Sequence, residues 1–183
     1  MLLALLLYLC SFSSFAVFHL WNISEIYSND DGSVQYIELF TQASGQQFVS
    51  GHDINSLEQD NSTRATFTFP TNSPAGTSGK HLLLATSGFS DVAGVNPDFT
   101  IPENFLSLAG GTVQFVGVDM LAFGVFPSDS SLAIQADGSV ATASPTNFAG
   151  VVGSIAGLDP IDECNGKKRT ITLRGFSHQF SCE

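Results

Sequence analysis

Short runs of strand-forming residues, ended by turn residues, set the strongest limit on how this 183-residue chain folds. No stretch shows convincing helical periodicity, and runs of this length between turn residues are typical of strands. The spacing predicts an all-β fold, a β-sandwich of about six to nine short strands with long loops. The runs lie at Leu20–Tyr27, Gln35–Phe40, Thr66–Phe69, His81–Thr86, Thr112–Val116, Asp119–Phe123 and Thr170–Leu173.

Local patterns predict how some of these strands lie. Ser28–Ser33 contains only turn residues, so the strands on either side form a hairpin. His81–Thr86 is continuously apolar after its first residue, which indicates a central strand buried on both faces. Residues 128–157 are rich in Ser, Ala and Gly and predict long loops with at most one hairpin, around Asp137-Gly138. Four side chains are expected inside the sandwich: Phe67, Leu83, Val113 and Phe115.

The start of the chain has the pattern of a secretory signal peptide. No charged side chain occurs before His19, and the apolar run Leu2–Cys10 is shorter than the roughly twenty residues that span a bilayer. Ser14-Phe15-Ala16 is a small-x-small cleavage sequence. We therefore expect a signal peptide at 1–16, a single mature domain at 17–183 without a transmembrane segment, and a secreted, cell-surface or periplasmic location. A retained anchor, or a lipid anchor at Cys10, is the alternative.

Cleavage after Ala16 leaves two of the three cysteines, Cys164 and Cys182. An even number of cysteines in an exported chain predicts a disulfide. Closing this short loop contributes roughly 3 kcal/mol by restricting the unfolded chain. The competing two-thiol metal site lacks the closely spaced cysteine pairs that zinc uses.

The charge distribution bears on partners. The chain carries a net charge of −11, which argues against general nucleic-acid binding. Residues 17–163 hold sixteen acidic and two basic residues, whereas residues 164–183 hold four basic and one acidic. The basic end is either a docking tail or a strand that neutralises the acidic body.

Motifs for catalysis are mostly missing. The chain has no Gly-x-Ser-x-Gly elbow, no His-Glu-x-x-His sequence and no Gly-x-Gly-x-x-Gly loop. Glu25 and Glu38 could face each other across the predicted hairpin, the carboxylate pair that sugar hydrolysis uses. A structural role, in which they cap backbone amides, is the favoured alternative. We assign no catalytic residue and expect no cofactor; the histidines His19, His52, His81 and His178 are isolated in sequence.

Two further patterns concern ions and glycans. Asn29, Asp30 and Asp31 at the predicted hairpin tip are a weak calcium candidate, against an ordinary solvated acidic turn. Asn22-Ile23-Ser24 and Asn61-Ser62-Thr63 fit the N-glycosylation pattern. Asn61 is the better acceptor because Asn22 lies inside a predicted strand.

Several motifs occur in a fixed order between Leu20 and Gly124. They are the opening strand, turn and Ile37-Glu38-Leu39; Phe67-Thr68-Phe69-Pro70; Gly79 before Leu82–Thr86; and Leu108–Phe115 with its Gly-Gly-Thr-Val. The ordered set resembles the lamin tail domain family, especially small secreted bacterial proteins that carry it. The resemblance implies an immunoglobulin-like β-sandwich without a conserved active site. Residues from 128 onward have no counterpart in it, and no hydrophobic sorting tail follows.

These observations lead to two hypotheses about function. The first is a secreted, non-enzymatic module that contacts an extracellular protein or a cell-surface polymer, without nucleic acid. The second is a secreted hydrolase whose acid and base lie on loops that the sequence does not bring together. A structure distinguishes them by showing whether His, Asp or Glu, and Ser side chains converge.

Overall fold

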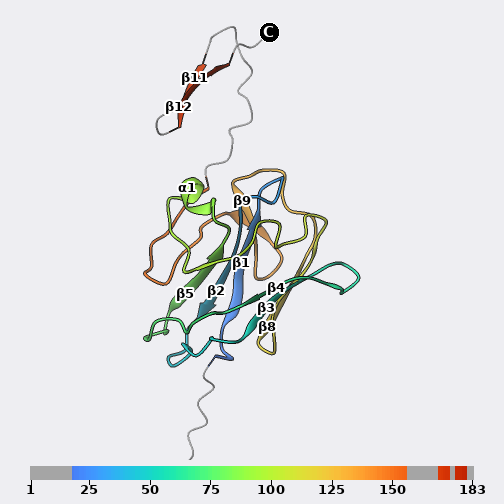
Figure 1. Ribbon diagram of the computed structural model, residues 1–183, viewed down its shortest axis with the longest axis vertical. Coiled ribbons are helices and arrows are strands. Elements are labelled where there is room, and N and C mark those ends of the chain that lie inside the picture. The colour runs from blue at the N-terminus through green and yellow to red at the C-terminus, as the bar shows by residue number, and fades with distance from the viewer. Residues whose placement is uncertain (1–17, 156–168, 174–175, 181–183) are drawn as a thin grey trace, which may run out of the picture.

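The computed structural model describes residues 18–155, 169–173 and 176–180. Within residues 18–155, ten strands form two packed sheets, and one short helix, α1 (Phe89–Ala93), lies beside them (Figure 1). The predicted β-sandwich is therefore confirmed, with ten strands rather than the six to nine expected. None of the described helices is long and apolar enough to cross a membrane.

The larger sheet has six strands in the order β10-β9-β1-β2-β5-β6. All neighbours are antiparallel except β5 and β6, which pair in parallel. The predicted hairpin is present, since β1 and β2 pair directly. The strands are β1 (Asn22–Ser28), β2 (Gln35–Thr41), β5 (Lys80–Ala85), β6 (Phe99–Thr100), β9 (Leu132–Gln135) and β10 (Val140–Thr142).

The smaller sheet has four antiparallel strands in the order β4-β3-β7-β8. They are β3 (Asp53–Leu57), β4 (Thr63–Thr68), β7 (Gly111–Phe115) and β8 (Asp119–Phe123). A separate two-stranded sheet pairs β11 (Arg169–Leu173) with β12 (Phe176–Phe180). Each predicted run overlaps a strand, but β3, β6, β9, β10, β12 and α1 were not among them. The hairpin predicted around Asp137-Gly138 is confirmed as the turn between β9 and β10.

The main core lies between the two sheets. Alternate side chains of β1, β2 and β5 meet those of β3, β7 and β8 there, as expected of a sandwich. Val113 and Phe115 are fully buried in it, as predicted, and Phe67 packs against it while partly buried.

A second core covers the outer face of the six-stranded sheet. Leu83 belongs to this core and not to the interior of the sandwich, so its predicted place was wrong although its burial was right. The reason is that β5 is buried on both faces: Leu82 and Leu84 point inward while Leu83 points outward. Residues from α1 and from the segment 143–155 cover this outer face, including Phe89, Ala93, Ala143 and Ile155.

Within residues 18–155, the four-stranded sheet is covered on one face only. Val113 and Phe115 point inward, so Thr112 and Gln114 face outward, and Thr66 and Thr68 on β4 are exposed. The two sheets thus differ: the central strands of one, β1, β2 and β5, are buried on both faces, and the other presents a face to solvent.

Candidate functional site

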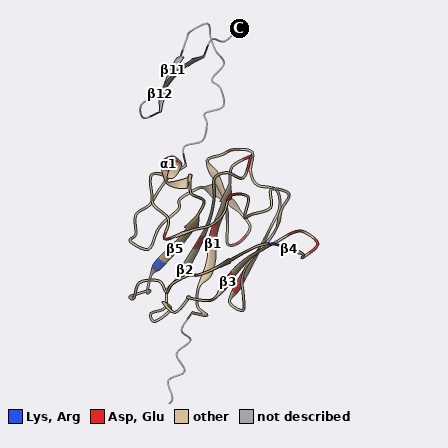
Figure 2. Ribbon diagram, viewed as in Figure 1, with Lys and Arg blue, Asp and Glu red and all other residues tan. Residues whose placement is uncertain are grey.

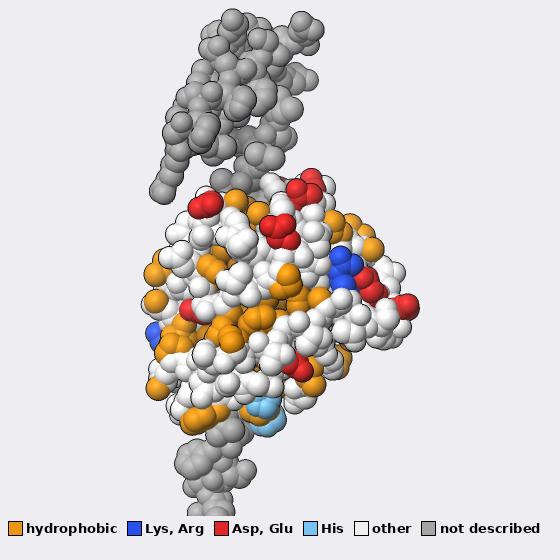
Figure 3. Space-filling view, viewed as in Figure 1, with side chains coloured by type: hydrophobic (Ala, Val, Ile, Leu, Met, Phe, Trp, Pro, Cys, Tyr) orange, Lys and Arg blue, Asp and Glu red, His pale blue; other side chains and the backbone are white. Residues whose placement is uncertain are grey.

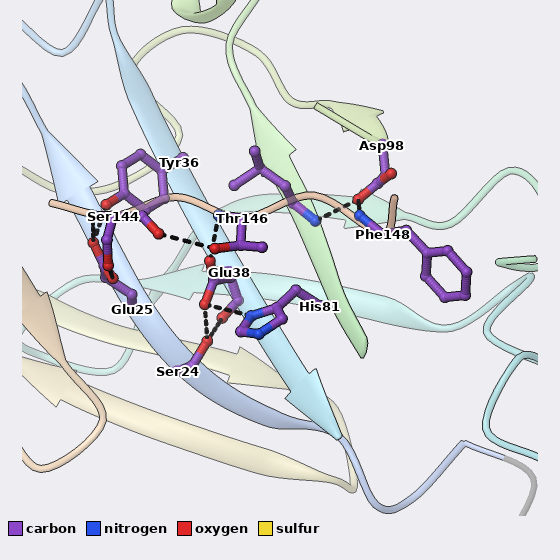
Figure 4. A network of polar contacts seen from close by, with 10 residues as sticks. Ser24, Glu25, Tyr36, Glu38, His81, Asp98, Ser144, Thr146 and Phe148 are labelled. Carbon is purple, nitrogen blue, oxygen red and sulfur yellow. Dashed lines mark hydrogen bonds and ion pairs between the residues drawn. The ribbon is translucent and has the colours of Figure 1, made fainter. Parts of the chain in front are cut away.

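The clearest polar cluster among the described residues lies on the outer face of the six-stranded sheet (Figure 4). Glu25 on β1 and Glu38 on β2 are register partners, and each is only 3% exposed. The register shifts between Ile23 and Glu25, which marks a bulge in β1. Because of this bulge, Ser24 also reaches the cluster, and its hydroxyl donates to Glu38 Oε1 at 2.7 Å.

The two carboxylates hold a segment that crosses the sheet, residues 144–148. Ser144 N donates to Glu25 Oε1 at 2.9 Å, and Thr146 N donates to Glu38 Oε2 at 2.6 Å. Two residues farther, Phe148 N donates to Asp98 Oδ2 at 2.9 Å. Alternate N–H groups of this crossing segment therefore end on carboxylates from β1, β2 and the loop before β6, as Figure 4 shows.

The local sequence of the crossing segment fits this pattern of alternate hydrogen bonds. Its residue 145 is proline, which has no N–H, and in an extended chain that position faces away from the carboxylates. Its carbonyl instead accepts Gly153 N at 2.8 Å, and Asn147 N donates to Val151 O at 3.1 Å. Residues 145–153 thus turn back on themselves, and Gly153 lies against α1 and the loop after it, where a side chain would meet Ala93 O and Val95.

Glu25 accepts further hydrogen bonds from side chains on the same face. Tyr36 OH donates to its Oε1, and Ser144 Oγ donates to its Oε2 at 3.2 Å. Burial, with the nearby Glu25 charge, raises the pKa of Tyr36 far above its ordinary value. Burial also raises the pKa of Tyr27, which stacks on Tyr36, to about 12. Both phenols therefore remain protonated donors at neutral pH.

His81 on β5 brings an imidazole to the edge of the cluster. Its Nδ1 lies 2.9 Å from Glu38 Oε1, and its side chain is 29% exposed. A serine, a glutamate and a histidine thus do converge here. In a hydrolytic triad the hydroxyl bonds to the imidazole, whereas here Ser24 and His81 both face the carboxylate between them.

All four oxygens of Glu25 and Glu38 therefore have partners in the structure. The predicted opposition of the two glutamates is confirmed, and both accept backbone N–H groups, as their structural interpretation predicts. Sequence reasoning missed Ser144, Thr146 and Asp98. They lie far from the hairpin in sequence, and nothing in their local pattern marks them.

The calcium candidate lies at the β1–β2 turn. Asn29 Oδ1 accepts Val34 N, and Asp31 Oδ1 accepts both N and Oγ of Ser33. These serine hydrogen bonds lower the pKa of Asp31, and Asp30 is exposed beside it. In the described part of the chain, no group of three or more His, Cys, Asp or Glu side chains could hold a metal ion. Calcium binding at this tip stays a prediction.

The other predicted residues are dispersed. Asn22 opens β1 and Asn61 occupies the turn after β3, and both are exposed. Asn61 has a φ of 64°, in the left-handed region. The signal peptide at 1–16, Cys164 and Cys182 lie outside the described residues, so cleavage and the disulfide stay predictions.

Comparison with known proteins gives no further information on the site: no family model, curated protein or solved structure matches the chain.

Proposed function

We propose that the protein is a secreted, non-enzymatic module that attaches to a cell-surface polymer through the outer face of its four-stranded sheet. One observation carries this proposal: the outer face of the six-stranded sheet is buried under the crossing segment and α1, while no other described residues cover the outer face of the four-stranded sheet. The buried carboxylates of the β-sandwich bind backbone N–H groups and are not available to a ligand. We therefore take the outer face of the four-stranded sheet as the binding surface.

The chemistry of the open face favours a neutral, hydroxyl-rich polymer over a charged protein. Asn55, Thr66 and Gln114 lie side by side across three strands, and Thr66 Oγ1 donates to Asn55 Oδ1 at 2.8 Å. Hydroxyl and amide groups can both donate to and accept from polymer hydroxyls. On β3, the carboxylate of Asp53 already accepts a hydrogen bond from Thr68 at 2.6 Å. In Figure 2, the ribbon is red at acidic residues in several loops of the sandwich.

Binding to insoluble polysaccharides tests this proposal. The purified exported chain is mixed with peptidoglycan, chitin and cellulose, and the fraction retained is measured after washing. We expect retention on at least one polymer, and we expect the double variant Asn55→Ala, Gln114→Ala to lose about tenfold or more in affinity. Thr142→Ala, an exposed threonine on β10 in the other sheet, is the matched control and should bind as the parent does.

The second hypothesis, a hydrolase, has one observation in its favour: Ser24, Glu38 and His81 lie together. It predicts soluble sugar or peptide products during the same incubation, and their loss in His81→Ala. Product release that depends on His81, or retention that survives the Asn55 and Gln114 double variant, would contradict the proposed function.

A further inference from the structure

One end of the sandwich is built from segments without a charged side chain. The start of β1 lies beside the end of β2, and Ile23 N donates to Asp119 Oδ2 at 2.7 Å, which joins the two sheets at this end. The pairing of the strands brings four segments together here: residues 18–21, 42–52, 69–79 and 116–118. None of the four contains Asp, Glu, Lys or Arg, and together they form what we call the uncharged end.

The opposite end of the sandwich is acidic. The segments between strands there are residues 29–34, 58–62, 86–98, 101–110 and 124–131. Each of them contains at least one Asp or Glu, and none contains Lys or Arg. Figure 3 shows acidic side chains around this end, and histidine beside hydrophobic side chains at the uncharged end. Charge in these segments is therefore separated along the direction of the strands.

Three charged side chains begin strands next to the uncharged end, and each has a partner. Asp53 begins β3 and accepts a hydrogen bond from Thr68 Oγ1 at 2.6 Å. Asp119 begins β8 and accepts the bond from Ile23 N described above. The ammonium of Lys80, at the start of β5, lies over an aromatic ring, 5.6 Å from its centroid. These groups flank the uncharged end, and the segments that form its surface stay free of charge.

Apolar side chains are exposed at the uncharged end. Leu20, Phe48 and Val116 come from three of its four segments, and each is between 41% and 50% exposed. The segments are tied together by hydrogen bonds. Leu20 N donates to Gln46 Oε1 at 3.0 Å, and Ser73 N donates to a backbone carbonyl of the segment 42–52 at 3.0 Å. The exposed apolar surface is therefore part of the fold.

A lipid bilayer fits this surface better than a protein partner does. Charged side chains are costly in the acyl region, so a surface that enters it carries apolar side chains without charges between them. A protein interface has no such requirement, and its rim is usually polar. The uncharged end has exposed apolar side chains on three segments and no charged residue in any of the four. When this end faces a membrane, the acidic end points away from anionic headgroups.

We propose that the uncharged end docks on the surface of a lipid bilayer, with Leu20, Phe48 and Val116 inserted between the headgroups and the acyl chains. The acidic end then lies farthest from the membrane. The outer face of the four-stranded sheet runs along the strands and stays accessible, so this inference does not rest on polymer binding. It does not rest on signal-peptide cleavage either, because the described residues alone form the surface.

Binding to phosphatidylcholine vesicles tests the proposal. These vesicles carry no net charge, so the net charge of −11 on the protein does not oppose binding. The full-length protein and its variants are sedimented with the vesicles over a range of lipid concentrations. We expect the parent to bind, and the double variant Leu20→Ser, Phe48→Ser to lose about tenfold or more in affinity. The matched control is Val125→Ser, Val140→Ser, which removes two side chains at least as exposed elsewhere and should bind as the parent does.

The single tryptophan of the chain reports which end faces the lipid. Trp21 lies at the uncharged end, where its Nε1 donates to Gln46 O at 2.9 Å. Phosphatidylcholine brominated on its acyl chains should therefore quench the fluorescence of Trp21 in the parent and in the control variant. This measurement on the parent needs no substitution, so a folding defect of a variant cannot produce its result.

The parent and both variants share residues 1–17, so any contribution of that segment to lipid binding is the same in all three. Equal binding of the parent and the Leu20, Phe48 variant would overturn the proposal, and so would sedimentation without quenching. A parent that does not bind the vesicles would overturn it as well. Dimers of such a parent that the Leu20, Phe48 variant does not form would assign the uncharged end to a contact with a second copy of the chain instead.

Discussion

The carboxylate of Asp98 accepts hydrogen bonds that stabilise the fold, while the burial of its charge destabilises the fold. Its Oδ2 accepts both Leu83 N and Phe148 N, at 2.8 and 2.9 Å. Burial nevertheless raises the pKa of this carboxyl above its ordinary value, because desolvation outweighs the two hydrogen bonds. The folded protein therefore binds a proton at Asp98 more readily than the unfolded chain does. This contribution to stability is present below the unfolded pKa and is lost as the pH rises through the folded one.

Exposed aspartates behave in the opposite way. In each of four turns, the hydroxyl and then the N–H of the serine two residues later donate to an aspartate, and these hydrogen bonds lower the pKa of the aspartate. These groups favour folding above their unfolded pKa, and the contribution is lost as the pH falls. The aspartates are Asp31, Asp60, Asp129 and Asp137. The pH dependence of the unfolding free energy is therefore a sum of opposing contributions. Only a variant can isolate the contribution of Asp98.

The variant Asp98→Asn isolates the contribution of the Asp98 carboxyl to the pH dependence of stability. Since a single oxygen accepts both N–H groups, the amide oxygen of asparagine can replace it and keep both bonds. We expect the stability of the parent relative to the variant to fall as the pH rises from about 3 to 6, since only the parent acquires the buried charge. Urea unfolding of both proteins across this range measures the difference. A constant difference, or one that grows with pH, would show that the carboxyl is not destabilised by burial.

At the scale of elements, sequence patterns predicted the longer runs of strand-forming residues but missed short strands such as β9, although three of its four residues are apolar. The run Leu82-Leu83-Leu84 predicted burial on both faces of β5, and the second core is the reason that the prediction holds. Strand β3 was missed because Asp53–Leu57 has only two apolar residues, Ile54 and Leu57. It is a strand because it pairs on both sides, with β4 and β7, and such long-range pairing leaves no local signal.

The candidate site was predictable only in part, for the same reason. A hairpin between β1 and β2 is a local feature, and it places Glu25 opposite Glu38. The backbone partners of these two side chains, the N–H groups of Ser144 and Thr146, lie more than a hundred residues away in a stretch with the composition of a loop. It is ordered because the carboxylates satisfy its N–H groups, since buried backbone donors need acceptors.

The crossing segment yields a prediction about Glu38. In Glu38→Gln, the amide oxygen can still accept Thr146 N, while the amide group meets Ser24 and His81, which can adjust. We expect a loss of about 1 kcal/mol for Glu38→Gln and roughly 3 kcal/mol for Glu38→Ala, which leaves the Thr146 N–H without an acceptor. Urea unfolding measures the loss, and amide hydrogen exchange at Thr146 should accelerate in both variants. Glu103→Ala, at an exposed position, is the control and should change neither quantity.

The whole molecule has two cores that share the six-stranded sheet. Strand β2 contributes Ile37 and Leu39 to the core between the sheets and Tyr36 to the outer core. Neither core can lose its packing without affecting the strands that form the other. We therefore expect the sandwich to unfold as one cooperative unit, as small domains usually do.

Core truncations on the two faces test this cooperativity. Phe115→Ala empties part of the core between the sheets and should cost about 3–5 kcal/mol, and Leu83→Ala in the outer core about 2–5 kcal/mol. The chain supplies a probe for each core: Trp21, its single tryptophan, is buried between the sheets, and Tyr27 stacks on Tyr36 in the outer core. Tryptophan fluorescence and the near-ultraviolet circular dichroism of the tyrosines should give coincident urea transitions in the parent and in both variants. Separation of the two transitions in Leu83→Ala would mean that the crossing segment and α1 detach first, leaving a sandwich that folds without its outer core.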